Sequence, residues 1–229
     1  MLNVAHYHVA YGQSEVLHGL DFTVAPGEII AIMGRNGMGK TTLMKSLMGI
    51  VPTKDGAAAV DGVDVTTMKS YERVANGIAY VPQGRLIFPA MTVQENIETG
   101  LSISGRRKVP GDIFELFPVL LDMKSRRGGN LSGGQQQQLA IARALATNPK
   151  VLLLDEPTEG IQPSIIREMA RVLKRIRDER ELSIVVSEQV LSFALDVADR
   201  VLVLENGRLV HDEPRESVDE EKVAAFLSV

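Results

Sequence analysis

The stretch Gly34-Arg35-Asn36-Gly37-Met38-Gly39-Lys40-Thr41 fits G-x-x-x-x-G-K-[ST], the pattern of a phosphate-binding loop. The apolar run before it, residues 28–33, follows Pro26-Gly27 and indicates a buried strand. Residues 42–48 after it have the apolar spacing of a helix and end at Gly49. In such a unit the glycines turn backbone N–H groups toward a phosphate, and the helix N-terminus adds its positive end. The alternative is a glycine-rich turn before a core helix. We interpret the stretch as a nucleotide site.

The side chains of this loop have separate predicted roles. Lys40 would reach the β- and γ-phosphates of the nucleotide, and the Thr41 hydroxyl would ligate Mg²⁺. The predicted phosphate-binding residues are Gly34, Asn36, Gly37, Gly39, Lys40, Thr41 and Thr42. The loop alone leaves open whether the chain is a GTPase, a kinase, a recombinase or a transport ATPase.

Composition narrows the class of protein. The 229 residues suffice for one α/β domain with an inserted subdomain, and 45% hydrophobic with 24% charged residues are typical of a globular protein. A net charge of −4 argues against binding driven by nucleic-acid phosphates. The chain has no cysteine, which excludes thiol catalysis, thiolate metal sites and disulfides. It shows neither a signal peptide nor an apolar run of the ~18 residues that a membrane span needs.

Periodicity and turn residues predict the order of elements. Strands are expected at 2–10, 19–24, 57–60, 63–65 and 78–81, with a helix at 70–76. A capping box, Thr92-Val93-Gln94-Glu95, opens a helical insert that contains no convincing strand. Further along we expect helices at 133–147, 164–180 and 190–198, strands at 151–154 and 184–186, and a hairpin of 201–204 with 208–210. The acidic tail, 212–222, is expected to be a solvated helix.

A second element places two carboxylates at the end of a buried strand. Residues 152–154 are leucines, and Asp155 and Glu156 follow them. Phosphoryl transfer depends on positioning and charge neutralisation, so Asp155 suits Mg²⁺ and Glu156 suits an attacking water. The alternative is a strand that ends at a polar turn.

A third element is the run Leu131-Ser132-Gly133-Gly134-Gln135, a polar glycine pair that opens a helix. Its hydroxyl and free backbone N–H groups would form a second anion site. One ATP could engage both sites within one chain, but two chains that sandwich two ATPs explain them better. In this arrangement the chain resembles the ATP-binding-cassette ATPases, with Walker A at 34–41, the signature at 131–135 and Walker B at 151–156.

The resemblance implies a fold and further roles. The expected fold is α/β: a P-loop nucleotide-binding core with an antiparallel β subdomain and an inserted α-helical subdomain. One ATPase domain would span residues 1–229, with 1–91 and 131–229 as the core and 92–130 as the helical subdomain. Tyr11 would stack on adenine, and Gln83 would contact Mg²⁺ or water. The residues that would serve ATP bound mainly to a partner chain are Ser132, Gly133, Gly134 and Gln135.

Two positions depart from the family pattern. Gln189 stands where the family usually has a histidine that contacts the γ-phosphate; it can donate a hydrogen bond but cannot exchange a proton. The loop that typically ends in Asp reads Glu159-Gly160-Ile161-Gln162 here. Both features are typical of branched-chain amino acid importers and their relatives. Within that group, Arg35 and Gln83, with the runs 81–85, 135–138 and 160–166, are more similar to the urea-type ATPases.

The function implied is the ATP-hydrolysing subunit of an importer of urea or short amides, with branched-chain amino acids as the alternative. The expected partners are a second, non-identical cassette, two transmembrane permeases and an external solute-binding protein, with the chain at the cytoplasmic face of the inner membrane. Two rivals are a soluble cassette protein acting on ribosomes or DNA and a cassette whose ATPase is vestigial. The first usually carries two cassettes or a coiled-coil insert, and Lys40, Asp155 and Glu156 argue against the second.

Overall fold

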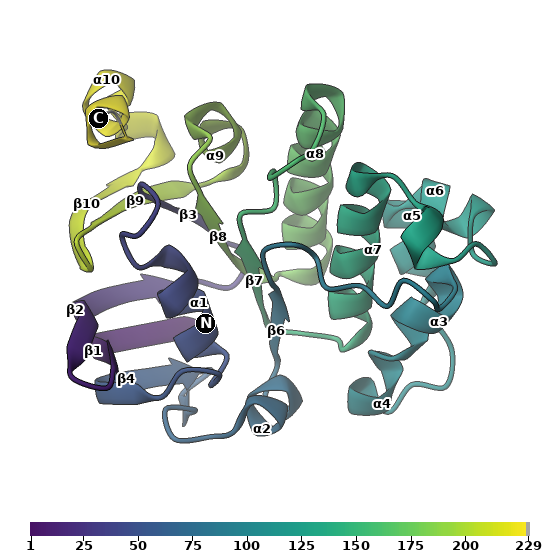
Figure 1. Cartoon of the computed structure of the whole chain (residues 1–229), viewed down its shortest axis with the longest axis horizontal. Helices are drawn as coiled ribbons and strands as arrows, with labels where there is room; N and C mark the ends of the chain where they lie inside the picture. The colour runs from purple at the N-terminus through teal and green to yellow at the C-terminus, as the bar shows by residue number, and fades with distance from the viewer. Residues whose placement is uncertain (228–229) are drawn as a thin grey trace.

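The computed structural model describes residues 1–227, in which two β-sheets and a group of helices pack around three hydrophobic clusters (Figure 1). The strands are β1 Leu2–Tyr11, β2 Ser14–Val24, β3 Ile29–Met33, β4 Thr53–Val60, β5 Val63–Asp64, β6 Ile78–Val81, β7 Val151–Asp155, β8 Ser183–Glu188, β9 Arg200–Glu205 and β10 Arg208–Pro214. The helices are α1 Lys40–Leu47, α2 Ser70–Ala75, α3 Val93–Glu98, α4 Leu101–Ser104, α5 Gly111–Leu116, α6 Pro118–Asp122, η1 Gly128–Asn130, α7 Gly133–Ala146, α8 Pro163–Arg180, α9 Leu191–Val197, η2 Arg215–Ser217 and α10 Glu220–Leu227.

The larger sheet has the strand order β10-β9-β3-β8-β7-β6. All neighbours in it are parallel except the β9–β10 pair, which the Asn206-Gly207 turn joins as an antiparallel hairpin. Every residue of β3, β7 and β8 is buried. Continuous apolar runs form such strands because helices or another sheet cover both faces of a parallel sheet. The carboxyl ends of β3, β7 and β8 therefore meet at one edge of the sheet.

The smaller sheet is antiparallel, in the order β2-β1-β4-β5. Its alternating inner side chains, such as Val4 and Leu20, pack with α1 and with one face of the larger sheet in a single cluster. The other face of the larger sheet packs against α7 and α8. Figure 1 shows α1 between the two sheets and α3 to α6 at the opposite end of the molecule, beyond α7. The two sheets thus hold the loop between β3 and α1 in a fixed place.

Most predicted elements are confirmed. Both predicted N-terminal turns are present, since Thr92 and Ser132 each accept a hydrogen bond from the backbone of the residue three positions on, in complete capping boxes. One prediction is wrong. Residues 212–222 are not a solvated helix, because β10 continues to Pro214 and α10 begins only at Glu220, with Val223 buried in a cluster against β9. Pairing with β9 overrides the acidic composition that favoured an exposed helix.

The predicted strand 19–24 is also longer, since β2 begins at Ser14 and follows β1 directly. No helix in the described residues is both long enough and apolar enough to cross a membrane.

Candidate functional site

The predicted phosphate-binding loop wraps around the amino group of Lys40. The side chain is buried, and its Nζ donates to the carbonyl oxygens of Gly34, at 2.6 Å, and Arg35, at 3.1 Å. A cavity of about 340 Å³ opens beside it, lined by Val16, Asn36, Gly37, Gly39, Lys40, Thr41, Thr42, Gln83 and Glu156. Of the predicted loop residues, only Gly34 does not line this cavity.

Gly34 is needed for a different reason. A Cβ atom at this position would lie 2.5 Å from the carbonyl oxygen of Leu204 on β9, and no real Cβ atom tolerates such a contact with backbone. Gly39, at the first turn of α1, has a φ of 108°, which L side chains rarely adopt. The loop's path between β3 and α1 therefore depends on these two glycines.

Asp155 ends β7 and is surrounded by hydroxyl groups. Its Oδ1 accepts hydrogen bonds from Ser187 Oγ, at 2.6 Å, and Thr41 Oγ1, at 3.2 Å, and its Oδ2 accepts one from Tyr80, also at 3.2 Å. Burial, together with the neighbouring Asp155 carboxylate, raises the pKa of Tyr80, so that its hydroxyl stays protonated and donates. Within residues 1–227, Asp155 is 2% exposed and has no ion pair.

This donor set fits Mg²⁺. A buried carboxylate with no protein counter-ion, beside the Thr41 hydroxyl, offers the hard oxygen atoms that Mg²⁺ prefers. Mg²⁺ is usually held by one or two carboxylates together with substrate phosphates, which accords with the finding that no group of three or more His, Asp or Glu in the described chain could hold a metal alone. Thr41 and Asp155 would hold the ion; Gln83 lines the cavity nearby.

The Glu156 carboxylate lies at the centre of the predicted site residues. Its Oε1 is 3.3 Å from Lys40 Nζ and accepts a 2.9 Å hydrogen bond from Gln189 Nε2, while Gln83 Nε2 donates to Oε2 at 3.4 Å. Its backbone has a positive φ of 46°, a strained conformation for a residue with a side chain. Three residues from three separate segments are therefore brought together around the carboxylate of Glu156.

Three successive residues at the end of β8 hold the end of β7 and the loop after it. Ser187 holds Asp155 and also accepts, through its carbonyl oxygen and its Oγ, from the backbone N–H of Glu156. Glu188 accepts from both the N–H and the hydroxyl of Thr158, and its other oxygen accepts from the N–H groups of Gln189 and Val190.

Gln189 is the third of these successive residues, and its Nε2 donates to Asn36 Oδ1 at 2.8 Å as well as to Glu156. The sequence analysis identified Gln189 but missed Ser187, Glu188 and Tyr80. The polar pair Ser187-Glu188 at the end of an apolar strand was a visible signal, but its partners depend on the register of β7 with β8.

The predicted signature residues lie elsewhere. Ser132 caps α7, and Gly133, Gly134 and Gln135 form its first turn, but none of the four lines the cavity beside Lys40. Gly133 lies instead near the loop after β7, where a Cβ would be 3.3 Å from the Gly160 carbonyl oxygen. The signature residues therefore do not line the same cavity as the phosphate-binding loop.

Tyr11 also lies outside that cavity. It ends β1 and is 50% exposed, whereas Val16 of β2 lines the cavity instead. Val16 is a residue that the sequence analysis missed, because its place beside the loop depends on how β2 packs against α1.

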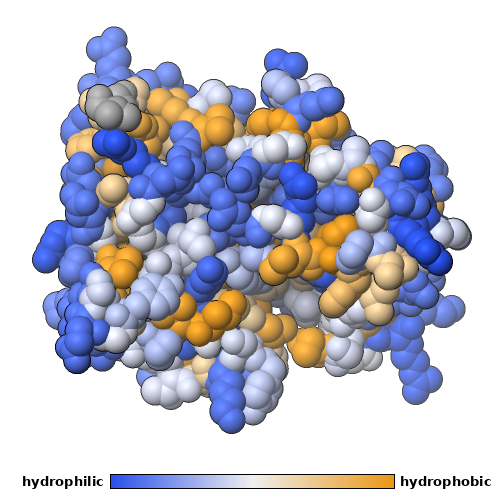
Figure 2. All heavy atoms as spheres, viewed as in Figure 1, coloured by the Kyte–Doolittle hydropathy of each residue, from blue (hydrophilic) through white to orange (hydrophobic). Residues whose placement is uncertain are grey.

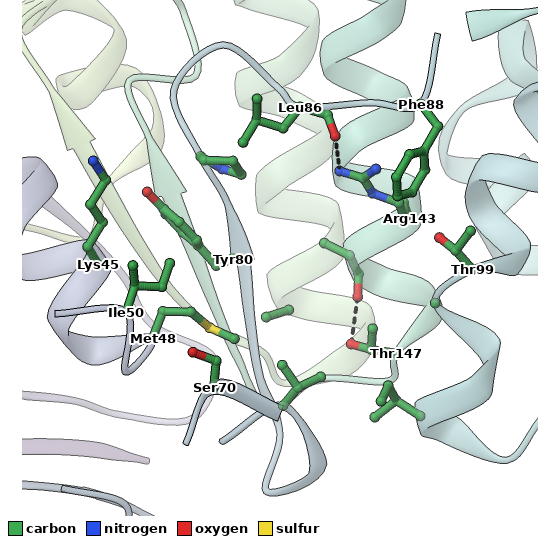
Figure 3. Close-up of a pocket in the computed structure, with 16 residues that line it drawn as sticks. Lys45, Met48, Ile50, Ser70, Tyr80, Leu86, Phe88, Thr99, Arg143 and Thr147 are labelled. Atoms are coloured by element: carbon green, nitrogen blue, oxygen red, sulfur yellow. Dashed lines mark hydrogen bonds between the residues drawn. The ribbon is translucent and has the colours of Figure 1, made fainter. Parts of the chain in front are cut away.

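A second, mainly apolar groove of about 530 Å³ lies behind the site. Figure 3 shows Lys45, Met48, Ile50 and Tyr80 on one wall and Phe88, Thr99 and Arg143 on the other. Several of its side chains are exposed, including Ile50 (55%), Leu86 (67%) and Phe88 (46%), and Figure 2 shows hydrophobic side chains gathered around a hollow on this face. Arg143 closes the far end by donating to the Leu86 carbonyl oxygen and lying over the Phe88 ring.

Comparisons with known proteins agree with the geometry. The ABC transporter family matches residues 17–159. The high-affinity branched-chain amino acid transport ATP-binding protein BraG of Pseudomonas aeruginosa is 39% identical over 93% of this chain and 92% of its own length. The lipopolysaccharide export system ATP-binding protein LptB of Escherichia coli is 33% identical over 93% and 91%. The solved structure of MJ1267, an ATP-binding cassette of an ABC transporter, superposes with a TM-score of 0.82 at 26% identity, over 99% of this chain and 94% of its own.

Proposed function

Because this chain belongs to the ABC transporter family of ATPases, we propose that it powers an importer through the site around Glu156. The ATPase activity and ATP as the nucleotide follow from the family. The observation that carries the assignment of catalytic roles is the convergence of Lys40, Gln83 and Gln189 on the Glu156 carboxylate.

Each residue of the site has a separate role in ATP hydrolysis. Lys40 and the N–H groups of the loop neutralise and hold the phosphates, and Thr41 with Asp155 holds Mg²⁺, which supplies positive charge to the phosphate oxygens when bound. Glu156 accepts a hydrogen bond from the attacking water and orients it. Gln189 holds this carboxylate against Asn36 of the loop through both N–H groups of its side-chain amide. One of these N–H groups would turn to a phosphate, as a neutral donor, when nucleotide binds. Tyr11 remains our proposal for the contact with adenine.

Two copies or two related cassettes would form the complete site, with Ser132 to Gln135 of one chain against ATP held by the other. We keep the division into a core, residues 1–91 and 131–229, and a helical subdomain, residues 92–130, as part of this proposal. The remaining partners are two permeases and an external solute-binding protein, which would hold this chain at the cytoplasmic face of the inner membrane.

The apolar groove supports a docking site for the permeases. Exposed Ile50, Leu86 and Phe88 lie around a hollow that an apolar segment of a partner would cover, and such patches mark interaction sites. The groove also includes Pro82, the residue before Gln83, so a segment seated there would lie next to the loop that contacts Glu156. Ile50→Glu should reduce recovery of the chain with permeases more than it reduces ATP binding.

For the solute, the similarity to BraG favours branched-chain amino acids, which we propose as the cargo. Urea or a short amide is the second candidate, favoured by Arg35 and Gln83 and by the run Gly160-Ile161-Gln162. An export ATPase is also 33% identical to this chain, so overall sequence identity by itself does not identify the transported solute. Uptake of labelled leucine and labelled urea by cells carrying Lys40→Ala distinguishes the two: the solute whose uptake is lost is the cargo, and loss of neither overturns the importer.

The catalytic assignment is tested with Glu156→Gln in the purified chain. The variant should retain ATP binding and lose about 10²- to 10³-fold in hydrolysis rate, the cost of removing one catalytic group from such a site. Glu179→Gln, the same chemical change at an exposed position of α8, is the matched control and should leave the rate unchanged. Hydrolysis by Glu156→Gln at the parent rate would contradict the role of this carboxylate.

A further inference from the structure

Tyr80 is in contact with both the apolar groove and the predicted metal ligand Asp155. Its ring lines the apolar groove, and its hydroxyl donates to Oδ2 of Asp155. Figure 3 shows the ring on the wall formed by α1 and β6, with the hydroxyl at its far end from the strand. Among the described residues, Tyr80 is the groove residue whose side chain hydrogen-bonds to the side chain of a predicted metal ligand.

The sheet register explains how one side chain reaches both. In the parallel β6–β7 pair Tyr80 lies opposite Leu153, and Asp155 follows two residues later on the same face of the sheet. Side chains in strands lean along the strand, so a long side chain at position 80 can reach the carboxylate at the strand end. A shorter residue would line the groove without touching Asp155.

The contact completes the orientation of the carboxylate. Ser187 and Thr41 both donate to Oδ1, whereas Tyr80 is the donor to Oδ2. Without it, the plane of the carboxylate is fixed through one oxygen only. Partners that orient a ligating carboxylate in this way usually affect metal affinity strongly.

We propose that Tyr80 is a positioning residue that couples the groove to the Mg²⁺-binding carboxylate. The inference rests on the proposed function, since the occupant of the groove is an apolar segment of a permease. The tyrosine ring is rigid, so a partner that displaces its groove edge also displaces its hydroxyl, and Asp155 responds. Through the same hydrogen bond, binding of Mg²⁺ and nucleotide then shifts the Tyr80 ring in the groove, because coupling between two sites is reciprocal.

The first test measures the affinity of the full chain for ADP, with and without Mg²⁺, by calorimetry. Tyr80→Phe keeps the ring and removes only the hydroxyl. It should leave metal-free ADP affinity within about twofold and weaken Mg²⁺ binding to the ADP complex about tenfold, as expected for loss of a hydrogen bond that orients a ligating carboxylate. Tyr71→Phe, at an exposed tyrosine of α2, is the matched control and should change neither.

The outcomes separate this inference from the proposed function. Equal Mg²⁺ dependence in Tyr80→Phe and the parent would overturn the positioning role. Failure of the parent itself to bind ADP would overturn the nucleotide site and with it the proposed function.

The second test measures a fluorescence change at a residue of the groove. Because the chain has no cysteine, Ile50→Cys provides a single thiol for an environment-sensitive fluorescent label at an exposed groove position. Addition of Mg²⁺ and ADP should change the emission of this label, and Tyr80→Phe in the same background should remove at least half of the change, while Tyr71→Phe keeps it. The same response in all three proteins, or no response in the labelled parent, would refute the coupling.

Discussion

Glu188 is a buried carboxylate that accepts four hydrogen bonds from neutral donors, which makes Glu188→Gln a sharp test of the site's architecture. The amide has nearly the same shape, but an NH₂ group replaces one of the two oxygens. If the NH₂ group faces Gln189 and Val190, both of their N–H groups lose their acceptor. If it faces Thr158, the backbone N–H of Thr158 loses its acceptor, while the Thr158 hydroxyl can turn and accept from the NH₂ group.

The expected cost follows from the less costly orientation, which leaves one buried N–H without an acceptor. Each unsatisfied buried donor costs about 1–2 kcal/mol, so the free energy of unfolding should fall by at least about 1–2 kcal/mol. With a urea dependence of about 2–3 kcal/mol per M, the midpoint of urea unfolding should fall by about 0.5 M. Because Glu188 orients the backbone of Gln189, the kcat of ATP hydrolysis should also fall, by about tenfold, with a smaller change in KM.

Urea unfolding without nucleotide and steady-state ATPase assays check both expectations. Glu179→Gln removes an exposed ion pair with Arg175 on the same helix, and it should change the free energy of unfolding by less than about 0.5 kcal/mol. If Glu188→Gln unfolds within about 0.5 kcal/mol of the parent, the four hydrogen bonds do not hold the two loops and our account of the site's rigidity is wrong.

Three further results are expected. In urea unfolding, Gly207→Ala should lower the free energy of unfolding by about 1–3 kcal/mol more than Gly62→Ala does. Both glycines have a positive φ, but only at Gly207 would a Cβ overlap backbone, at 1.9 Å from a carbonyl oxygen of β2. Equal losses in the two variants would contradict this explanation. Arg73→Met should cost about 2–4 kcal/mol in the same assay, because the buried guanidinium donates to four backbone carbonyl oxygens, and an unchanged midpoint would show that these need no partner. Hydrogen bonds from Lys54, and then from His8, lower the pKa of Glu15 to about 2 from an ordinary 4.5. The contribution of Glu15 to stability is therefore present above about pH 4.5 and is lost as the pH falls toward 2. Lys54→Met should raise the pKa of Glu15, and an NMR titration that gives the parent carboxyl a pKa near 4.5 would refute the prediction.

The sequence by itself determined the local units. The phosphate-binding loop lies between an apolar run and a helix, and each of these forms from neighbouring residues, so the pattern was sufficient to predict β3 and α1. The cap at Thr92 depends on side chains three residues apart and was predicted for the same reason. Ser132 was predicted to begin a helix, but its capping box with Gln135 was not predicted. Lys40 and Glu156 were identified because their motifs include them.

Tertiary structure decided which of these units share a site. Ser187, Glu188 and Gln189 contact Glu156 and Thr158 from about 30 residues away, and only the parallel pairing of β7 with β8 in the observed register brings them together. The first residues of the acidic segment, 212–214, continue β10 because pairing with β9 satisfies their backbone groups. Tyr80 was an ordinary strand residue in the sequence, and its double contact arises from its position opposite β7. Local patterns depend on residues that are neighbours in the chain, whereas the site and the groove depend on which strands lie side by side, and the burial of the whole core sets that arrangement.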